Sequence, residues 1–154
     1  MVDMTFKVDG LANIQRAMKE LPERVARNVL TSAVRAGGQV IRKDALSRIR
    51  DKKAIILVKR RSPKGTALFS VGLTKEKWKL RFLEFGTAPH VIKSKTGKNM
   101  TDGSTFFGRV VRHPGMSARP FLRPAFDGNI MRAIEVIRVQ AEKRIAKEAE
   151  KLRK

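Results

Sequence analysis

The sequence predicts an α+β fold, in which N-terminal helices and a long C-terminal helix pack on a small antiparallel β-sheet formed by the middle of the chain. Apolar residues recur at helical spacing between Leu11 and Ile49, and again after Pro124. Between these regions the apolar residues cluster or alternate as they do in β-strands. The chain has 154 residues, of which 42% are hydrophobic, so we expect a single domain over residues 1–154.

The N-terminal helical region divides at Pro22. A short helix begins at Leu11, and Pro22 ends this helix or starts the next one. The second helix contains the pair Gly37-Gly38, and each glycine costs about 1 kcal/mol relative to alanine. Two alternatives follow: the helix breaks at this pair, or another backbone packs closely against it. The apolar stripe of the second helix comprises Leu30, Val34, Ile41, Ala45 and Ile49.

The middle of the chain begins with two β-like patterns. Residues 54–59 and 66–73 are joined by the turn-like sequence Arg61-Ser62-Pro63-Lys64-Gly65, which predicts a hairpin. In residues 77–82 a basic residue alternates with an apolar one, which predicts a half-buried strand with its lysines at an exposed sheet edge. The apolar residues of this predicted strand are Trp78, Leu80 and Phe82.

The last third of the chain ends in the clearest helix. Residues 93–104 are polar and predict a mobile loop, residues 105–112 predict a strand, and His113-Pro114-Gly115 predicts a turn. Pro124 suits the first turn of a helix, where its missing N–H costs nothing, and Asp127 complements the positive start of that helix. The apolar stripe of this helix comprises Phe126, Ile130, Ala133, Ile137, Ala141, Ile145, Ala149 and Leu152.

Positive charge is concentrated in the middle of the chain. The whole chain has 35 Lys and Arg against 14 Asp and Glu, a net charge of +21. Residues 52–125 have seventeen basic against three acidic residues, a net charge of +14, whereas residues 1–51 carry +4 and residues 126–154 carry +3. The central segment therefore faces nucleic acid, an acidic protein surface, or both.

Several classes of protein are excluded by composition. The chain has no cysteine, which excludes disulfides, thiolate nucleophiles and cysteine–metal sites and indicates folding in a reducing cytoplasm. The longest apolar run, residues 54–58, is far shorter than the ~20 residues of a membrane span. Residues 1–10 lack the apolar segment of a secretory signal, so no membrane partner is expected.

The two histidines do not predict a metal site. Such a site needs three or four ligands, and His90 and His113 have no cysteine beside them. Each histidine adjoins a proline, which favours a role in stabilising loops or in packing. Gly97-Lys98 resembles the end of a phosphate-binding loop, but Asn99 replaces the required Ser or Thr. We therefore expect no metal and no cofactor.

Glu84 is an isolated acid in the basic middle of the chain, beside Phe85-Gly86-Thr87. One hypothesis makes it a catalytic acid. The other makes it a structural carboxylate that pairs with Lys or Arg, or accepts backbone N–H groups at the Gly86 turn. The sequence offers neither a paired carboxylate nor a Gly-x-Ser-x-Gly nucleophile motif, so we favour the structural role and expect a protein that is not an enzyme.

Non-specific nucleic-acid binding is the alternative function. The charge of the middle segment suits a phosphate backbone, and Trp78, Phe82, Phe106 and Phe107 are aromatic rings able to stack on bases. Against this, Trp78 and Phe82 lie on the apolar face of the predicted strand, where core packing is commoner. No helix-turn-helix, zinc-finger, RNP or basic-zipper pattern is present. We expect at most a weak, sequence-independent affinity.

Two segments resemble the motifs of a known family. The first is Phe82-Leu83-Glu84-Phe85-Gly86-Thr87, followed by Pro89-His90-Val91-Ile92. The second is His113-Pro114-Gly115, followed by Ala118-Arg119-Pro120-Phe121-Leu122-Arg123-Pro124-Ala125-Phe126. The N-terminal Phe6-Lys7-Val8-Asp9-Gly10-Leu11 and Leu21-Pro22 are also similar. In this order and spacing, the motifs resemble the phage tail-component family, also described as neck, tail-completion or head–tail joining proteins of long-tailed phages and prophages.

The resemblance implies a non-catalytic virion subunit, made in the cytoplasm of the bacterial host, that forms a homo-oligomeric ring around the DNA channel. Its implied partners are other copies of the chain and the neighbouring connector, head-closure, and tail-terminator or tail-tube proteins. In this setting Gly86 supplies the positive φ of a tight turn, Pro120 and Pro124 stiffen the lead into the last helix, and Phe121 locks that helix against the core. The family-motif positions are Glu84, Phe85, Gly86, Thr87, His90, His113, Pro114, Gly115, Arg119, Pro120, Phe121, Leu122, Arg123 and Pro124.

Overall fold

Helices and short antiparallel strands alternate along the chain, which confirms the predicted α+β class. The computed structural model describes residues 11–19 and 21–152. None of the helices in this part of the chain has an apolar stretch long enough to cross a membrane. In order, the elements are α1 (Leu11–Lys19), α2 (Glu23–Ser47), β1 (Ile55–Arg60), β2 (Leu68–Leu73), the 3-10 helix η1 (Lys75–Leu80), α3 (Arg81–Phe85), β3 (His90–Lys93), β4 (Met100–Thr101), β5 (Phe106–Gly108), β6 (Val110–His113), α4 (Leu122–Asp127) and α5 (Ile130–Leu152).

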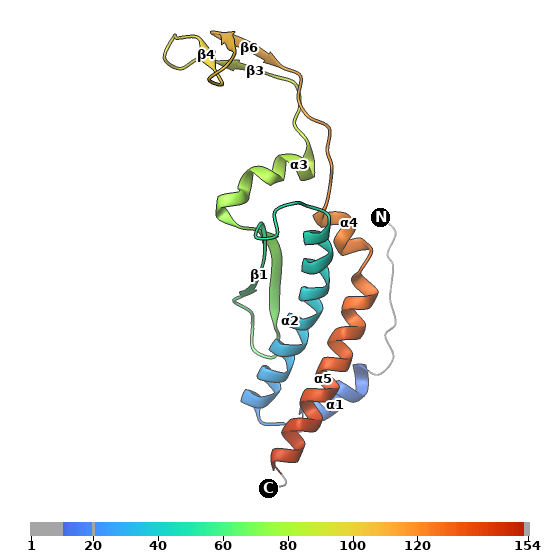
Figure 1. Ribbon diagram of the computed structural model, residues 1–154. Coiled ribbons are helices and arrows are strands. Elements are labelled where there is room, and N and C mark those ends of the chain that lie inside the picture. The colour runs from blue at the N-terminus through green and yellow to red at the C-terminus, as the bar shows by residue number, and fades with distance from the viewer. Residues whose placement is uncertain (1–10, 20, 153–154) are drawn as a thin grey trace.

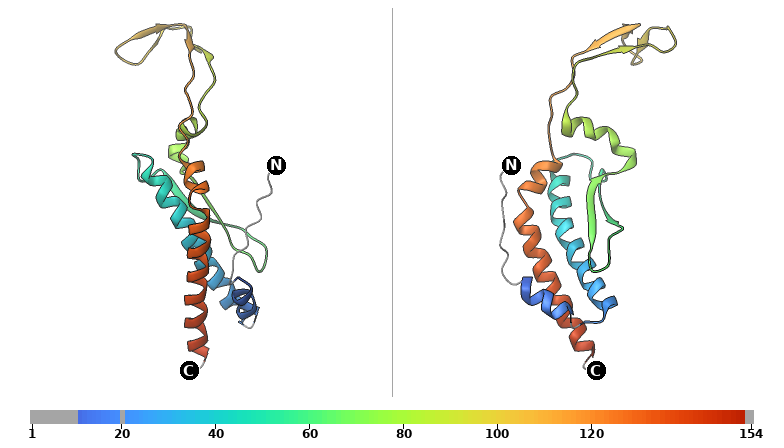
Figure 2. Two further views of the ribbon diagram at one scale, coloured as in Figure 1. Left: turned by 90° about the vertical axis from the view of Figure 1, so that its right-hand side faces the viewer. Right: turned by 180° about the vertical axis from the view of Figure 1, so that it is seen from behind.

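The molecule has an elongated body and an arm that projects from one end of it (Figure 1). In the body α2 and α5 lie side by side and run in opposite directions, with the β1–β2 hairpin on the other side of α2. The arm is residues 90–113, which contain β3 to β6. Two chain segments, residues 84–89 and 114–120, connect the arm to the body, and we call them the stem. In all three views the arm stands clear of the body (Figure 2).

The body is held together by two clusters of buried apolar side chains, one on each half of α2. The cluster near the stem contains Phe121, whose side chain is only 2% exposed. The other cluster lies where α2, α5 and α1 meet. The buried residues are Ala45, Ile49, Ala54, Ile55, Phe121 and Ala125 in the first cluster and Ile14, Val29, Ala33 and Ala141 in the second.

The pair Gly37-Gly38 is a site of close packing, and α2 continues through it without a break. A Cβ atom on Gly37 would lie 2.6 Å from Cγ1 of Ile137 and 2.9 Å from the carbonyl oxygen of Ala133. A Cβ atom on Gly38 would lie 2.7 Å from Cδ1 of Leu57. The sequence left two alternatives open, and the structure shows close packing: Gly37 allows α5, and Gly38 allows the hairpin, to lie close to α2.

The hairpin predicted for residues 54–73 is confirmed. β1 and β2 pair antiparallel, from Ile55 opposite Leu73 to Arg60 opposite Leu68. Ile55 is buried, and the Nε of Arg42 on α2 donates a hydrogen bond of 2.9 Å to its carbonyl oxygen. The antiparallel strands do not form one sheet, however. They form three separate two-stranded sheets, and only the β1–β2 hairpin packs on a helix of the body.

The strand predicted at Trp78, Leu80 and Phe82 is wrong, because these residues belong to η1 and α3. Leu80 and Leu83, three residues apart, pack against the cluster around Phe121. That spacing places both side chains on one face of a helical turn. The six-residue alternation of basic and apolar residues fits a helical turn as well as a strand. Because the segment is helical, its lysines do not protect a sheet edge.

The C-terminal helix is two helices with a break at Gly128. Pro124 lies in the first turn of α4, as predicted, but Asp127 ends α4 and does not start the long helix α5. Phe126 is 49% exposed and lies off the apolar stripe. The stripe residues of α5 pack on α2 and α1, not on a sheet, because α2 separates α5 from the hairpin.

The segments predicted as a loop and a strand in residues 93–112 are more divided than expected. The polar stretch 93–104 includes β4, which pairs with β5. The predicted strand 105–112 is split into β5 and β6 at Gly108, which has a φ of +81°. Mobility of residues 93–104 stays a prediction, which amide hydrogen exchange of the isolated chain would test.

Candidate functional site

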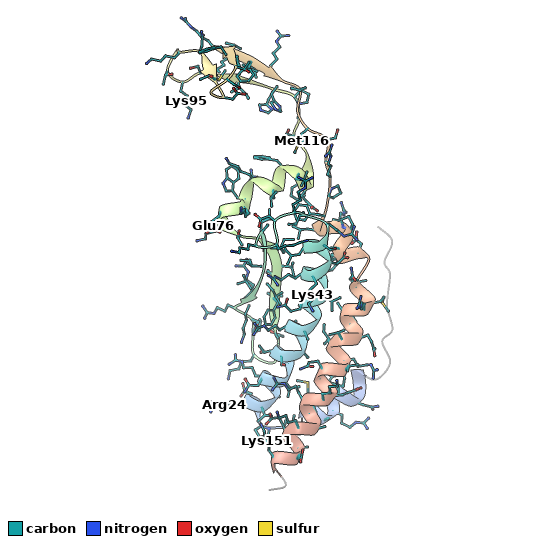
Figure 3. All side chains as sticks on the ribbon, in the orientation of Figure 1. Arg24, Lys43, Glu76, Lys95, Met116 and Lys151 are labelled. Carbon is teal, nitrogen blue, oxygen red and sulfur yellow. The ribbon has the colours of Figure 1, made fainter. Side chains whose placement is uncertain are left out.

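The two family-like motifs lie side by side in the stem. Thr87 and Met116 exchange two backbone hydrogen bonds, of 2.9 and 3.0 Å, and the N–H of Arg119 donates to the carbonyl oxygen of Leu83 at 2.7 Å. The pairing continues into the arm, where β3 and β6 place His90 opposite His113. Met116 thus lies between the body and the part of the arm where Lys95 is found (Figure 3). The motifs that resemble the family are therefore one structural unit.

Glu84 fastens the stem to the body. Its carboxylate is 7% exposed and accepts the backbone N–H groups of Phe121 (2.7 Å), Leu122 (2.9 Å) and Arg123 (3.0 Å). These groups begin α4, where N–H donors lack partners within the helix. Burial alone raises the pKa of the Glu84 carboxyl, but the three N–H donors and the charge of Arg123 more than compensate, so that its pKa lies below its ordinary value.

This geometry is that of a structural carboxylate. The predicted partners at the Gly86 turn are wrong, because the N–H donors come from the start of α4, more than thirty residues further along the chain. Both oxygens of the Glu84 side chain are already engaged with N–H groups of the backbone. A carboxylate held ionised in this way is poorly suited to donate a proton as a catalytic acid.

Two glycines permit the close contact between the stem segments. Gly86 has a φ of +70°, and a Cβ atom there would lie 2.6 Å from the carbonyl oxygen of Met116. Gly115 has a φ of +85°, and a Cβ atom there would collide with the carbonyl oxygen of Thr87. Each glycine belongs to one motif and faces the backbone of the other. The stem can therefore keep this pairing only with glycine at both positions.

The histidines stack on each other where the stem meets the arm. The ring centroids of His90 and His113 are 5.0 Å apart, with 28° between the ring planes. Nδ1 of His90 lies 2.9 Å from the carbonyl oxygen of Ala88, and Nδ1 of His113 accepts the N–H of Gly115 at 3.0 Å. Within residues 11–19 and 21–152, no group of three or more His, Asp or Glu side chains could hold a metal ion.

An open apolar groove of about 690 Å³ lies at the base of the stem. Phe85, 81% exposed, and Phe126, 49% exposed, both line it. Pro120 and Leu122 of the second motif line it as well, together with Ile41 of α2 and Val71 of β2. Arg119 and Pro114, which also belong to the second motif, are exposed. The second motif thus supplies both an anchor in the core and part of an apolar surface.

The arm exposes apolar side chains, including Phe106 and Val110 of the predicted strand 105–112. None of residues 90–113 is buried, and Phe106, Val110 and Val91 are 78%, 58% and 52% exposed. Residues directly opposite in an antiparallel pair share a face. Since Val91 is opposite Arg112 and Val110 is opposite Lys93, one face of the β3–β6 ribbon combines two valines with two cations. Sequence alternation alone could not reveal this, because it predicts a face without saying whether anything covers it.

The resemblance expected from the sequence rests on these two motifs, which meet in the stem, and on an N-terminal part whose residues 6–10 lie outside the described residues. The backbone hydrogen bonds between the two motifs and the bonds of the Glu84 carboxylate explain, without reference to any family, why these residues occur together. Compared with protein-family models, with curated proteins and with solved structures, the chain has no match.

Proposed function

We propose that the chain is a non-catalytic structural subunit of a tailed-bacteriophage virion, located at the head–tail junction and assembled as a ring around the DNA channel. The observation that carries this proposal is the arm: a β-ribbon with exposed apolar side chains, held away from the body by a stem that the two motifs build. The proposed partners are other copies of the chain and the adjoining connector, head-closure, and tail-terminator or tail-tube proteins.

The physical state of the arm supports a role in assembly. An isolated two-stranded ribbon is only marginally stable in water, and it gains stability when another surface covers it. Phe106 and Phe107 are 78% and 47% exposed, and full burial of one such side chain is worth about 1.5–3 kcal/mol. An arm that contacts the next subunit, which in turn extends its own arm, makes a head-to-tail contact. Such contacts close into rings when the rotation between neighbours permits.

A specific observation also favours the alternative, a non-specific nucleic-acid-binding protein that uses residues 52–125. Trp78 was expected in the core, but it is 48% exposed, and the guanidinium of Arg81 lies over its ring. The two proposals are compatible, since a ring around DNA requires a surface that tolerates polyanions. They differ in what the arm contacts: neighbouring protein subunits in the first proposal, and nucleic acid, together with the rest of residues 52–125, in the alternative.

Deletion of the gene from a phage or inducible prophage that encodes it tests the proposed function. A junction subunit is needed only when head and tail join. The deletion should therefore leave DNA-filled heads while infectious particles disappear, with tails absent, malformed or unattached. Expression of the intact gene from a plasmid should restore infectious particles. A normal yield from the deletion strain, or an arrest before DNA packaging, would overturn the proposal.

A further inference from the structure

The outer face of η1 and α3 carries a cluster of aromatic side chains around one arginine. Trp78, Arg81, Phe82 and Phe85 are spaced so that they share one face of a helical segment. The guanidinium carbon of Arg81 lies 5.5 Å from the ring centroid of Trp78 and 5.3 Å from that of Phe82. The Trp78 and Phe82 rings meet edge to face, with centroids 5.7 Å apart. We call these four residues the aromatic face.

The aromatic face is exposed but firmly placed. Leu80 and Leu83, on the other side of the same segment, pack against the cluster around Phe121. Trp78 is 48% exposed and Phe85 is 81% exposed. A large aromatic surface fixed in position and open to solvent loses little side-chain entropy when it binds a ligand, which is what favours such residues at binding sites.

Cations flank the aromatic face. Lys75, Lys79 and Arg81 are exposed, whereas Lys77 is engaged with Asp51, its Nζ lying 2.6 Å from the carboxylate. Of the two acids in this segment, Glu84 is buried in its hydrogen bonds with α4 and only Glu76 faces solvent. Figure 3 places Glu76 on the side of the body that carries the hairpin. The surrounding segment 52–125 has a net charge of +14. The complementary ligand is therefore a polyanion that also presents flat rings.

We propose that the aromatic face, with Lys75 and Lys79, is a contact site for nucleic acid, in which Trp78 stacks on an unpaired base and the cations hold neighbouring phosphates. Stacking on an aromatic ring accepts any base, so the site should be insensitive to sequence. An unpaired base exposes its ring, whereas a paired base inside a duplex does not. The site should therefore prefer single strands over duplexes of the same charge. It belongs to one subunit and does not depend on ring assembly.

Trp78 is the only tryptophan of the chain, so its fluorescence reports this site directly. The purified chain is titrated with an oligothymidylate, and fluorescence should be quenched to saturation with an affinity that falls steeply with salt. A blunt duplex with the same number of phosphates should quench less. Equal quenching by both would contradict stacking on an unpaired base. Equal binding to polyglutamate of matched charge would assign the face to an acidic protein instead and overturn the proposal.

Two variants with the same net charge distinguish a defined nucleic-acid-binding site from diffuse attraction by the charge of the whole chain. K75Q/K79Q/R81Q keeps Trp78 as the reporter, and K143Q/R144Q/K147Q removes three exposed cations of α5. The first should lower the slope of log Kd against log salt concentration by about 2, since each of the three lost phosphate contacts to a single strand contributes about 0.7 to that slope. The second should lower it much less. Equal effects from both variants would refute the site.

A third variant tests the stacking itself. Trp78→Ala should weaken binding of a labelled oligothymidylate at least about fivefold, measured by fluorescence anisotropy. Trp78→Phe retains a ring and should recover part of that loss. Circular dichroism of both variants controls for folding. Unchanged affinity of a folded Trp78→Ala variant would remove Trp78 from the site and overturn the proposal.

Discussion

The body and the arm use apolar residues in opposite ways. In the body, Phe121 is 2% exposed and belongs to a core that joins the hairpin, α2 and α4. In the arm, Phe106 is 78% exposed and none of residues 90–113 is buried. The same residue type therefore stabilises the fold in one region and is left for another molecule in the other. The stem separates these two roles, and changes in the body, stem and arm should have effects of decreasing size on stability.

Phe121→Ala should have the largest effect on stability. It removes a fully packed aromatic ring and leaves a cavity, which typically costs about 3–5 kcal/mol. Since the whole free energy of unfolding of such a domain is about 5–15 kcal/mol, the variant could unfold. Urea denaturation followed by circular dichroism measures the loss. A loss below about 1 kcal/mol would mean that Phe121 does not anchor the body. Phe106→Ala, in the arm, is the matched control and should change little.

Glu84→Gln should have an intermediate effect that depends on pH. The amide cannot reproduce an ionised carboxylate that accepts three N–H groups, and hydrogen bonds to a charged group contribute about 1.5–3 kcal/mol. Because folding lowers the pKa of Glu84, the native chain keeps this stabilisation above the ordinary value of 4.5 and loses it as pH falls through the lower pKa of the folded state.

Unfolding experiments on both proteins at several pH values check this sign. The difference in unfolding free energy between the native chain and Glu84→Gln should be largest near neutral pH and shrink below pH 4.5. Asp102 is a useful comparison, because its pKa is also lowered, by the backbone N–H groups of Thr105 and Ser104, but in the arm. Asp102→Asn should leave the stability of the body unchanged. A pH-independent difference for Glu84→Gln would contradict an ionised anchor.

Gly86→Ala should be more destabilising than Gly97→Ala, although both glycines have a φ of +70°. A positive φ disfavours alanine at both positions, and the ψ of −176° at Gly86 lies in a region essentially restricted to glycine, where such strain costs on the order of 1–3 kcal/mol. Only at Gly86 does the added Cβ atom also meet a backbone, 2.6 Å from the carbonyl oxygen of Met116, whereas nothing lies within 4 Å at Gly97. We expect Gly86→Ala to cost at least about 1 kcal/mol more, by urea denaturation. Equal costs would mean that the stem is looser than its backbone bonds indicate.

Much of the body could be predicted from the sequence, because its apolar patterns extend over several helical turns and its paired strands are close together in the sequence. The stripe Ala133, Ile137, Ala141 and Ile145 predicts a helix over several turns, and the two patterns around the Pro63-Lys64-Gly65 turn predict a hairpin. The strand predicted from the alternation at residues 77–82 was wrong, because six residues fit a helical turn and a strand equally well. The helix break at Gly128 was missed because Phe126 and Ile130 are four residues apart in the sequence, which is the spacing of one continuous helix.

The stem and the arm could not be predicted in the same way. The bond between Glu84 and the start of α4 joins residues that are 37 to 39 positions apart, and no local pattern encodes such a contact. The motifs suggested that both segments matter, but not that they touch. In the arm, Val110 belongs to a predicted strand, and Val91 belongs to the first motif. Whether a strand face is covered depends on what lies beside it, and no part of the body lies beside the arm.

The most direct test of this account replaces the arm, residues 90–113, with a two-residue glycine turn between Pro89 and Pro114. Neither core cluster contains an arm residue, so the melting temperature of the variant should match that of the native chain within a few degrees. In the gene-deletion strain, the native gene should restore infectious particles and the armless gene should not, with filled heads and tails left unjoined. A folded armless protein that restores normal yields would contradict the claim that the arm joins this subunit to its neighbours.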